Sequence, residues 1–598
     1  MKRTPSSTDD GPASKPGRRL RALLLPTAPG EAAVAASPRV GIRTLMRRFW
    51  PIARPYRRQI VAGLVFVALV PAVQSAEIWL FKLAFDEVVV PAELGPLAWI
   101  APVVIGLAAL GGLIGFGEDY TWTWAGERFL LDLRVKFFSH VQKLSLPQLG
   151  RRQTGDLLSR LSGDVQAIES FVLGGLAEIV SAAARIAFFG GALFLLDWRL
   201  ALVSLVVVPP FALSARWFSR LAKEAAREKR RRSGSLGAVA EESLTNTALV
   251  QSSGRLDHER ERVRREGEGI VQAELASARV SGAYAPVSTL IELAGVLSII
   301  ALGTWSVQEG RLTVGGVLAF LAYLSQLLRP IADLGHLVTT LFAASAGGER
   351  VLELLDEEPE IRDRPGAVAL GRARGALELE AVTFRHVGSL EPTLETVSLS
   401  IEAGEIVAVT GPSGAGKSTI ARLLMRFADP GNGVVRLDGR DLRECKLDSV
   451  RANVGYLQQE TLLFDASVGE NIAYGRPEAS QDEIEAAARS ARAHEFVTAL
   501  PAGYDTRVGP RGGDLSGGQR RRVEVARTLL RDTPVVVLDE PTTGLEGAEA
   551  TKVGEALREL LQGRTAVVVT HDPALVETAD RTIVVRDGRI VTEEGVVV

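Results

Sequence analysis

The sequence predicts a chain of two different parts: an all-α domain of six transmembrane helices, followed by an α/β domain built around a phosphate-binding loop. Three observations predict this division. Long apolar runs are confined to the first 345 residues, whereas short β runs alternating with helical patterns begin at about residue 376. A glycine-rich stretch, "GPSGAGKST", starts at Gly411, directly after one of these β runs.

Composition excludes some classes of protein. The chain has 598 residues, which is room for several domains. Its net charge of −2 argues against a broad basic surface, so no nucleic-acid partner is expected. Cys445 is the single cysteine, so no internal disulfide can form, and no role is assigned to its thiol.

Six segments are apolar enough, over a sufficient length, to cross a bilayer core of about 30 Å, which takes about 20 helical residues. Any one of them alone also fits a buried core helix, but six together favour the membrane. The chain is therefore predicted to be a multi-pass protein of the lipid bilayer. The predicted spans are 59–85, 95–118, 171–196, 199–217, 283–305 and 313–328.

The connections between the spans differ in length. Three are short, and two, at about 119–170 and 218–282, have the pattern of charged helices that extend past the membrane. The second contains "KEAAREKRRR", and positive charge collects on the cytoplasmic side. Both long connections and both termini are therefore expected in the cytoplasm. Residues 1–40 are rich in Pro, Ser and Gly, which predicts a disordered tail.

Three ionisable residues fall inside the predicted spans, where charge is costly and is usually paired or functional. Arg185 and Glu292 lie at matching depths in the third and fifth spans, and Glu77 lies in the first. One hypothesis is a polar substrate cavity, or an Arg185–Glu292 pair that gates it. The alternatives are a structural salt bridge or span boundaries misplaced by a turn.

The loop after Gly411 has the features of a nucleotide site. "EIVAVTGPSGAGKSTIARLL" matches the G-x-x-x-x-G-K-[ST] template in full, with a strand before it and a helix after it. The glycines let backbone N–H groups face a phosphate, Lys417 neutralises phosphate oxygens, and the Ser418 hydroxyl can ligate Mg²⁺. The predicted nucleotide-binding residues here are Gly411, Pro412, Ser413, Gly414, Ala415, Gly416, Lys417, Ser418 and Thr419.

A second strand pattern, "TPVVVLDEPT", carries two carboxylates. Four apolar residues, 535–538, bring Asp539 and Glu540 to the end of a buried strand. Asp539 is placed to hold Mg²⁺ through water, and Glu540 is placed to orient and polarise an attacking water.

A second glycine-rich segment, which begins at Asp514, is also predicted to form the N-terminus of a helix. In "DLSGGQRRRVEVARTLL", Val523, Ala526 and Leu530 are spaced for one buried face of a helix. The N-terminus of such a helix binds anions through free N–H groups and the helix dipole. One chain therefore has two candidate phosphate sites, the second formed by Ser516, Gly517, Gly518 and Gln519.

These motifs together resemble the nucleotide-binding domain of ABC (ATP-binding cassette) transporters, over about 371–598. "LSGGQ" between the loop and "VVVLDE", with a single His in "VVVTHD", makes the resemblance specific. The resemblance implies ATP and Mg²⁺ as cofactors. It implies that Gln459 senses the γ-phosphate and Mg²⁺, and that His571 is the switch histidine. The predicted catalytic residues are thus Glu540, His571 and Gln459, and the predicted metal ligands are Ser418, Gln459 and Asp539.

The membrane half is similar to the exporter-type (type IV) domain of the same family. "TGDLLSRLSGDV" and "EESLTNTALVQSSGR" resemble its two intracellular coupling segments. The resemblance covers nearly the whole chain after about residue 40. The implied domains are a tail at 1–40, a transmembrane domain at 41–345, a linker at 346–370 and a nucleotide-binding domain at 371–598.

A chain with one phosphate loop and one "LSGGQ" helix resembles half of a transporter. The resemblance implies that "LSGGQ" binds the γ-phosphate held by a second subunit, in either a homodimer or a heterodimer. Two nucleotide domains would close on two MgATP, and hydrolysis would reset them. The implied location is the bacterial inner membrane, with the nucleotide domain in the cytoplasm.

Three positions depart from the family pattern. His386 stands where a Tyr usually stacks on adenine, and this imidazole is still assigned to nucleotide binding with a smaller stacking area. Glu546 replaces the usual Asp at the D-loop, and Pro510 replaces a Glu in the X-loop. These departures leave the catalytic set intact and keep a heterodimer open.

The expected function is ATP-driven export of a lipid, a drug-like molecule or a peptide-like molecule. An importer of the same fold, with a siderophore-like substrate, is the alternative, and a gated channel would share the same motifs. The six spans exclude a soluble ABC ATPase of repair or translation. The sequence does not select among the substrates.

Overall fold

The computed structural model describes residues 42–595 except Gln153, Val207 and Val387. The predicted tail at 1–40 lies outside the described residues. The chain forms two compact units: one comprises the chain to Gln142 and Gln153–Glu357, and the other comprises Lys143–Arg152 and the chain from Glu358 onward. The first is called the membrane unit below, and the second the nucleotide unit.

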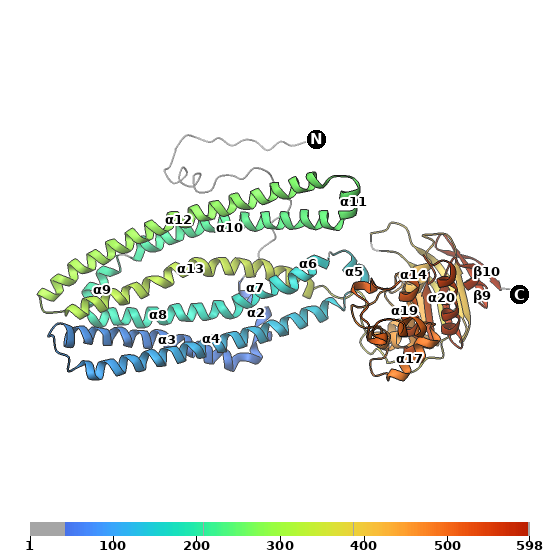
Figure 1. Cartoon of the computed structure of the whole chain (residues 1–598), viewed down its shortest axis with the longest axis horizontal. Coiled ribbons are helices and arrows are strands. Elements are labelled where there is room, and N and C mark those ends of the chain that lie inside the picture. The colour runs from blue at the N-terminus through green and yellow to red at the C-terminus, as the bar shows by residue number, and fades with distance from the viewer. Residues whose placement is uncertain (1–41, 153, 207, 387, 596–598) are drawn as a thin grey trace. The chain divides into compact units, whose positions relative to one another are not determined.

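Within the described residues, the membrane unit consists of helices and their connections and has no β-strand (Figure 1). Among the described residues, five continuous helical stretches are long and apolar enough to cross a membrane, and a sixth, shorter apolar stretch covers Val314–Leu327. Each contains or closely matches one predicted span, so the predicted all-α transmembrane domain is confirmed. The helices are α2 (Ile42–Ala53), α3 (Arg57–Ala84), α4 (Leu97–Val141), α6 (Thr154–Ser159), α7 (Val165–Glu169), α8 (Gly175–Leu196), α9 (Trp198–Ser204), α10 (Val208–Thr245), α11 (Thr247–Ser252), α12 (Leu256–Gln308) and α13 (Val314–Leu355).

The two long predicted connections are helical extensions of the spans, as expected. In Figure 1, α10 runs alongside α12 for most of its length. Ion pairs join the charged parts of the two helices, where Arg262 contacts Glu242 at 2.8 Å and Arg232 contacts Glu266 at 3.8 Å. These pairs hold the extensions together where apolar packing ends.

The hypothesised Arg185–Glu292 pair is not formed within the described residues of this chain. Arg185 Nε donates to Ser181 Oγ at 3.3 Å on its own helix, α8, and Glu292 of α12 is exposed. The reason is helix arrangement: α8 packs against α3 and α13, whereas α12 packs mainly against α10. Matching depth in the membrane does not make two helices neighbours.

The predicted linker is divided between the units. Helix α13 continues to Leu355, so residues 346–355 are helical, and buried Val351 and Leu354 explain why the helix persists. Residues from Glu358 onward lie against the nucleotide unit. There Val368 pairs with the segment at Cys445 in an isolated parallel bridge.

The nucleotide unit has two sheets. The six-stranded sheet, in the order β10-β9-β3-β8-β7-β6, is parallel except at β10. The four-stranded antiparallel sheet has the order β2-β1-β4-β5. The strands are β1 (Leu377–Phe384), β2 (Leu394–Ile401), β3 (Ile406–Thr410), β4 (Asn432–Leu437), β5 (Arg440–Asp441), β6 (Val454–Leu457), β7 (Val535–Asp539), β8 (Thr565–Val569), β9 (Arg581–Arg586) and β10 (Arg589–Gly595).

Several helices of this unit pack on the parallel sheet, confirming the predicted α/β class. Alternate residues of a strand face opposite sides, so Val535 and Val537 of β7 join one core while Val536 and Leu538 join the other. The helices are α5 (Leu146–Gly150), α14 (Lys417–Leu424), α15 (Leu447–Asn453), α16 (Val468–Ala473), α17 (Gln481–Ser490), α18 (His494–Thr498), α19 (Gly517–Arg531), α20 (Gly547–Leu561) and α21 (Pro573–Val576).

Candidate nucleotide site

The strand order brings the predicted site residues to one edge of the sheet. Strands β3, β8 and β7 are parallel neighbours, with Val409 opposite Val569 and Val569 opposite Asp539. Their carboxyl ends therefore lie together, which is where open α/β sheets bind ligands. The loop at Gly411, the carboxylates at 539–540 and His571 follow these three strands.

The phosphate loop needs glycine at two positions for space as well as conformation. Gly411 has φ +138° and Gly416 has φ +105°. A Cβ on Gly411 would lie 2.0 Å from the Val585 carbonyl oxygen, and one on Gly416 would lie 2.8 Å from the Thr393 carbonyl oxygen. A side chain at either position would displace the backbone of the loop.

Lys417 is buried at the start of α14, with 7 % of its surface exposed. Its Nζ donates to the carbonyl oxygens of Gly411 and Pro412, at 2.7 and 3.0 Å. A buried ammonium requires such partners because isolated burial of charge is costly. These bonds hold the positive charge inside the curve of the loop, where a phosphate would meet it.

Ser418 and Asp539 provide oxygen atoms suited to Mg²⁺. The Ser418 hydroxyl donates to Asp539 Oδ1 at 2.9 Å, and Asp539 is 94 % buried. Hydroxyl and carboxylate oxygens are ligands that Mg²⁺ prefers, with nucleotide phosphates and water completing its shell. Within the described residues no group of three His, Cys, Asp or Glu side chains forms a metal site. The donor set thus fits an ion that arrives with a nucleotide.

Tyr456 is a site residue that the sequence reading missed. It lies on β6, and its hydroxyl donates to Asp539 Oδ2 at 3.3 Å. Burial, together with the neighbouring Asp539 carboxylate, raises the pKa of Tyr456. The hydroxyl therefore keeps its proton and fixes the second oxygen of Asp539. The tyrosine stands only three residues before Gln459, which was the available signal.

Glu540 is held in a strained backbone conformation beyond the end of β7. Its φ is +50°, and its N–H donates to the Val569 carbonyl oxygen of β8 at 2.8 Å. A non-glycine residue in this region costs about 1–2 kcal/mol, and such strain gathers at functional sites. His571 Nε2 lies 3.4 Å from Glu540 Oε1, so the two predicted catalytic side chains meet.

The Gln459 segment is anchored by a buried ion pair on α19 that the sequence reading also missed. Arg521 donates to the carbonyl oxygens of Gln458 and Gln459, at 2.6 and 2.7 Å, and pairs with Glu524 at 2.7 Å. Burial raises the pKa of the Glu524 carboxyl, while Arg521 opposes that shift. The i,i+3 spacing of the two charges is visible in the sequence, but their burial is not.

Gln459 itself is exposed. Arg521 of α19 holds its backbone carbonyl group, whereas its side chain is open to solvent and can meet a ligand. Arg527, further along α19, donates to the Leu462 carbonyl oxygen at 3.1 Å and to the Asn471 carbonyl oxygen at 2.8 Å. Helix α19 therefore holds three carbonyl groups of this segment, those of Gln458, Gln459 and Leu462, and a fourth, that of Asn471, in α16.

The second predicted phosphate site is the N-terminus of α19. Ser516 forms a capping box with Gln519, accepting from the Gln519 N–H at 3.2 Å. The predicted buried face is confirmed, since Val523, Ala526 and Leu530 are all buried. Within the described residues, no hydrogen bond joins 516–519 to the loop at 411–419.

The three departures occupy distinct places. His386 packs edge-on to Phe384, and burial, with Arg422 nearby, lowers its pKa. Pro510 begins a 3₁₀ turn, and Glu546 is the N-cap of α20 without a side-chain cap bond.

A family model described as the ABC transporter transmembrane region matches residues 60–331, and one described as ABC transporter matches residues 394–543. An ATP-dependent lipid A-core flippase of Syntrophus aciditrophicus (strain SB) is 33 % identical over 551 residues, covering 92 % of this chain and 91 % of the relative. This chain belongs to the ABC transporter family.

Two further similarities define the class of ABC transporter. A putative multidrug export ATP-binding/permease protein of Bacillus subtilis (strain 168) is 32 % identical over 554 residues, covering 92 % of this chain and 95 % of the relative. A solved structure of a bacterial Atm1-family ABC exporter with ATP bound matches with a TM-score of 0.77 and 29 % identity, over 90 % of this chain and 95 % of that one. The chain is an ATP-hydrolysing half-transporter of the exporter class.

The Arg521–Glu524 pair gives a first prediction for this ABC transporter. Arg521→Met is expected to destabilise the nucleotide unit by about 3–5 kcal/mol, because Glu524 stays buried without its partner. A double variant, Arg521→Met with Glu524→Met, is expected to recover stability but not kcat, because the Gln458 and Gln459 carbonyls remain unheld. Thermal unfolding and ATPase rates measured on the same preparations check this. Recovery of kcat along with stability would assign the pair to folding alone.

Proposed function

We propose that the transporter is a dimer that exports an amphipathic lipid across the bacterial inner membrane, with its nucleotide units in the cytoplasm. One observation carries the dimer: a single chain has one phosphate loop and one capped "LSGGQ" helix, and no hydrogen bond joins them within the described residues. A second copy would supply the missing half of each site. The relatives named lipid A-core flippases support the lipid substrate.

The geometry at the sheet edge supports the following roles for the residues there, and the family resemblance supports those of Gln459 and residues 516–519. Lys417 and the N–H groups of the loop bind the β- and γ-phosphates. Ser418 and Asp539 hold Mg²⁺, which screens phosphate charge when bound. Glu540 orients the attacking water, His571 positions Glu540 and the γ-phosphate, and Gln459 senses that phosphate. Residues 516–519 bind the phosphate held by the partner subunit.

ATP drives transport in this proposal because it binds the closed dimer far better than the open one. A ligand shifts a conformational equilibrium only through such a difference in affinity. Closure opens the membrane units outward, and hydrolysis with phosphate release resets them. Both Glu540 and "LSGGQ" are present in this chain, so a homodimer has two complete sites.

Transport is tested in inside-out vesicles with a fluorescent phosphatidylethanolamine and, separately, a fluorescent cationic dye. The expected result is ATP-dependent movement of the lipid probe from the outer to the inner leaflet of the vesicle, absent with Glu540→Gln. Movement of the dye alone would replace the lipid by a drug-like substrate. Movement in the opposite direction would make the protein an importer. Activity that requires a second, different chain would establish a heterodimer.

The assignment of His386 to adenine stacking gives a second prediction. His386→Tyr is expected to lower the Kd for ATP about threefold, because a larger aromatic face stacks on the base. Because burial lowers the pKa of His386, the imidazole is neutral at pH 7, and the native Kd is expected to be constant from pH 7 to 8. Equilibrium binding in the Glu540→Gln background checks both, with exposed His258→Tyr as the control. An unchanged Kd in His386→Tyr would remove His386 from the base site.

A further inference from the structure

A short part of the linker is held at both ends inside the nucleotide unit. At one end, Gln148 of α5 donates to the Glu358 carbonyl oxygen at 3.0 Å and accepts from the Glu360 N–H at 3.3 Å. Ser145 Oγ also donates to Glu360 Oε2 at 3.0 Å. Helix α5 lies in the chain between α4 and α6 of the membrane unit, so this end of the linker is tied to a segment that leaves and re-enters that unit.

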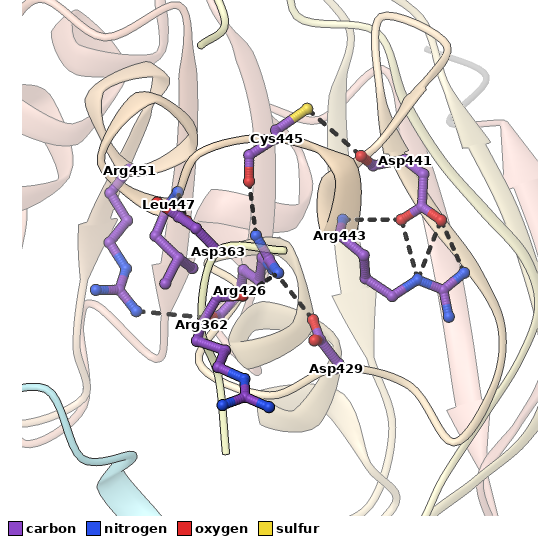
Figure 2. A network of polar contacts seen from close by, with 9 residues as sticks. All are labelled: Arg362, Asp363, Arg426, Asp429, Asp441, Arg443, Cys445, Leu447 and Arg451. Atoms are coloured by element: carbon purple, nitrogen blue, oxygen red, sulfur yellow. Dashed lines mark hydrogen bonds and ion pairs between the residues drawn. The ribbon is translucent and has the colours of Figure 1, made fainter. Parts of the chain in front are cut away.

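At the other end, the linker meets a buried arginine (Figure 2). Arg426 donates to the Arg362 carbonyl oxygen at 3.1 Å, to the Cys445 carbonyl oxygen at 2.8 Å and to Asp429 Oδ1 at 3.2 Å. Only 1 % of its surface is exposed, and its φ is +49°. These contacts of Arg426 with Arg362 and Cys445 are called the linker clamp below.

Neighbouring contacts make the linker clamp rigid. The Leu447 N–H donates to Asp363 Oδ1 at 2.8 Å, next to the clamped Arg362. Arg451 donates to the Arg426 carbonyl oxygen at 3.4 Å (Figure 2). A buried guanidinium that loses a carbonyl partner pays a desolvation cost, so the clamp resists partial opening.

The two ends of the held segment are close in the chain. One residue, Ile361, separates Glu360 from Arg362, so their Cα atoms are at most about 7 Å apart. Such a short tether passes a displacement at Gln148 on to the linker clamp with little slack. Helix α14 then connects the clamp to the nucleotide site, since Arg426 follows its C-terminus and Lys417 and Ser418 form its N-terminus. Helices of this length are stiff, about 12 Å from end to end.

A second set of contacts connects the linker clamp to Asp539, the carboxylate proposed to hold Mg²⁺. Phe427, next to Arg426, packs edge-on against Tyr456 with ring centroids 5.8 Å apart. Tyr456 in turn donates to Asp539. The linker clamp is therefore connected both to the phosphate loop and to Asp539.

We propose that Arg426 is a positioning residue that couples the α5 segment, through linker residues 358–362, to the phosphate-loop helix α14. In this proposal a displacement of the linker moves the C-terminal end of α14. The phosphate loop lies at the opposite, N-terminal end of the same helix. This proposal rests on the ATPase activity of the family and on no particular substrate.

The single cysteine offers a native reporter of the clamp. Cys445 is buried, its carbonyl oxygen is held by Arg426, and burial raises the pKa of its thiol. Thiol reagents attack the exposed thiolate. Its labelling rate therefore measures how often the linker clamp opens, and one cysteine in the sequence gives one signal.

The test uses the full-length transporter in nanodiscs of phosphatidylethanolamine and phosphatidylglycerol. Gln148→Ala removes the hold at the α5 end and leaves Arg426 untouched, whereas Arg426→Lys keeps the charge but loses the forked contacts. Each single variant is expected to raise the Cys445 labelling rate at least about threefold and to lower kcat by at least about the same factor. The KM for ATP is expected to stay within about twofold of the native value. The double variant is expected to lower kcat no further than the stronger single variant, because coupled residues are not additive.

Gln481→Ala is the matched control, since exposed Gln481 in α17 donates to Glu485 Oε1 on the same helix, at 3.2 Å, and its loss should change neither quantity. Unchanged labelling in Gln148→Ala would overturn the proposal even if Arg426→Lys did not fold. Losses of kcat that multiply in the double variant would also overturn it. Thiol labelling needs no transport substrate, so failure here is distinct from failure of the lipid transport assay.

Discussion

Glu540→Gln is expected to reduce ATP hydrolysis by about 10²–10⁴-fold, the usual contribution of a positioned general base. Glutamine keeps the shape of the side chain and can still contact His571 and Thr543, but it cannot accept a proton from water. The strained backbone at φ +50° and the bond to Val569 are unaffected, so the geometry of the loop is preserved. Affinity for ATP is therefore expected to stay within about threefold of the native value.

Phosphate release and equilibrium ATP binding, measured on the same preparation, check this expectation. The control is Glu559→Gln, which makes the same change at an exposed position of α20 and should leave hydrolysis unchanged. Near-native hydrolysis in Glu540→Gln would move the catalytic role to another residue. A matching loss of ATP binding would instead show that Glu540 supports the nucleotide itself.

Ser516→Arg is expected to lower hydrolysis at least about 100-fold, because a bulky cation blocks the approach of this helix N-terminus to the partner's phosphate. The phosphate loop of the same chain is unchanged, so the affinity of the open form for ATP should stay near the native value. Ser480→Arg is a matched control, since Ser480 forms the same capping box at the start of α17. Both variants lose an N-cap worth about 1 kcal/mol, and only Ser516→Arg is expected to lose activity.

ATP-induced closure gives an independent readout for the Ser516 variant. In the Glu540→Gln background, MgATP is expected to trap nucleotide in a closed dimer, and adding Ser516→Arg should abolish trapping. Equal losses of activity in Ser516→Arg and Ser480→Arg would reduce the role of Ser516 to helix stability. Trapping that survives Ser516→Arg would exclude "LSGGQ" from the shared site.

Much of the fold can be predicted from local sequence patterns. Apolar runs long enough for a bilayer and the template around Lys417 predict the two units, because each pattern is contiguous in the chain. The parallel strand order then brings Gly411, Asp539 and His571 to one edge, as their positions after apolar strands predict. Long-range pairing is harder to predict: Arg185 and Glu292 match in depth, but α8 packs mainly against α3 and α13, and α12 packs mainly against α10.

The contacts that position the site are less visible in the sequence. Arg521 and Glu524 resemble an ordinary exposed i,i+3 pair until the fold buries them. Arg426 has no motif, and its role depends on a carbonyl oxygen of Arg362 more than 60 residues away. Charge and Pro and Gly content predict a linker at 346–370. They do not reveal that α13 continues to Leu355, or that the residues from Glu358 onward are part of the nucleotide unit.

The ten residues Lys143–Arg152 belong to the nucleotide unit, although most of that unit begins only at Glu358. During synthesis these residues leave the ribosome long before their partners exist. At 5–20 residues per second, the roughly 200 residues between them take about 10–40 s to make. For that time Leu144 and Gln148, both buried in the finished protein, have no native surface to cover them. The nucleotide unit therefore cannot complete its fold until its second part, from Glu358 onward, has been synthesised.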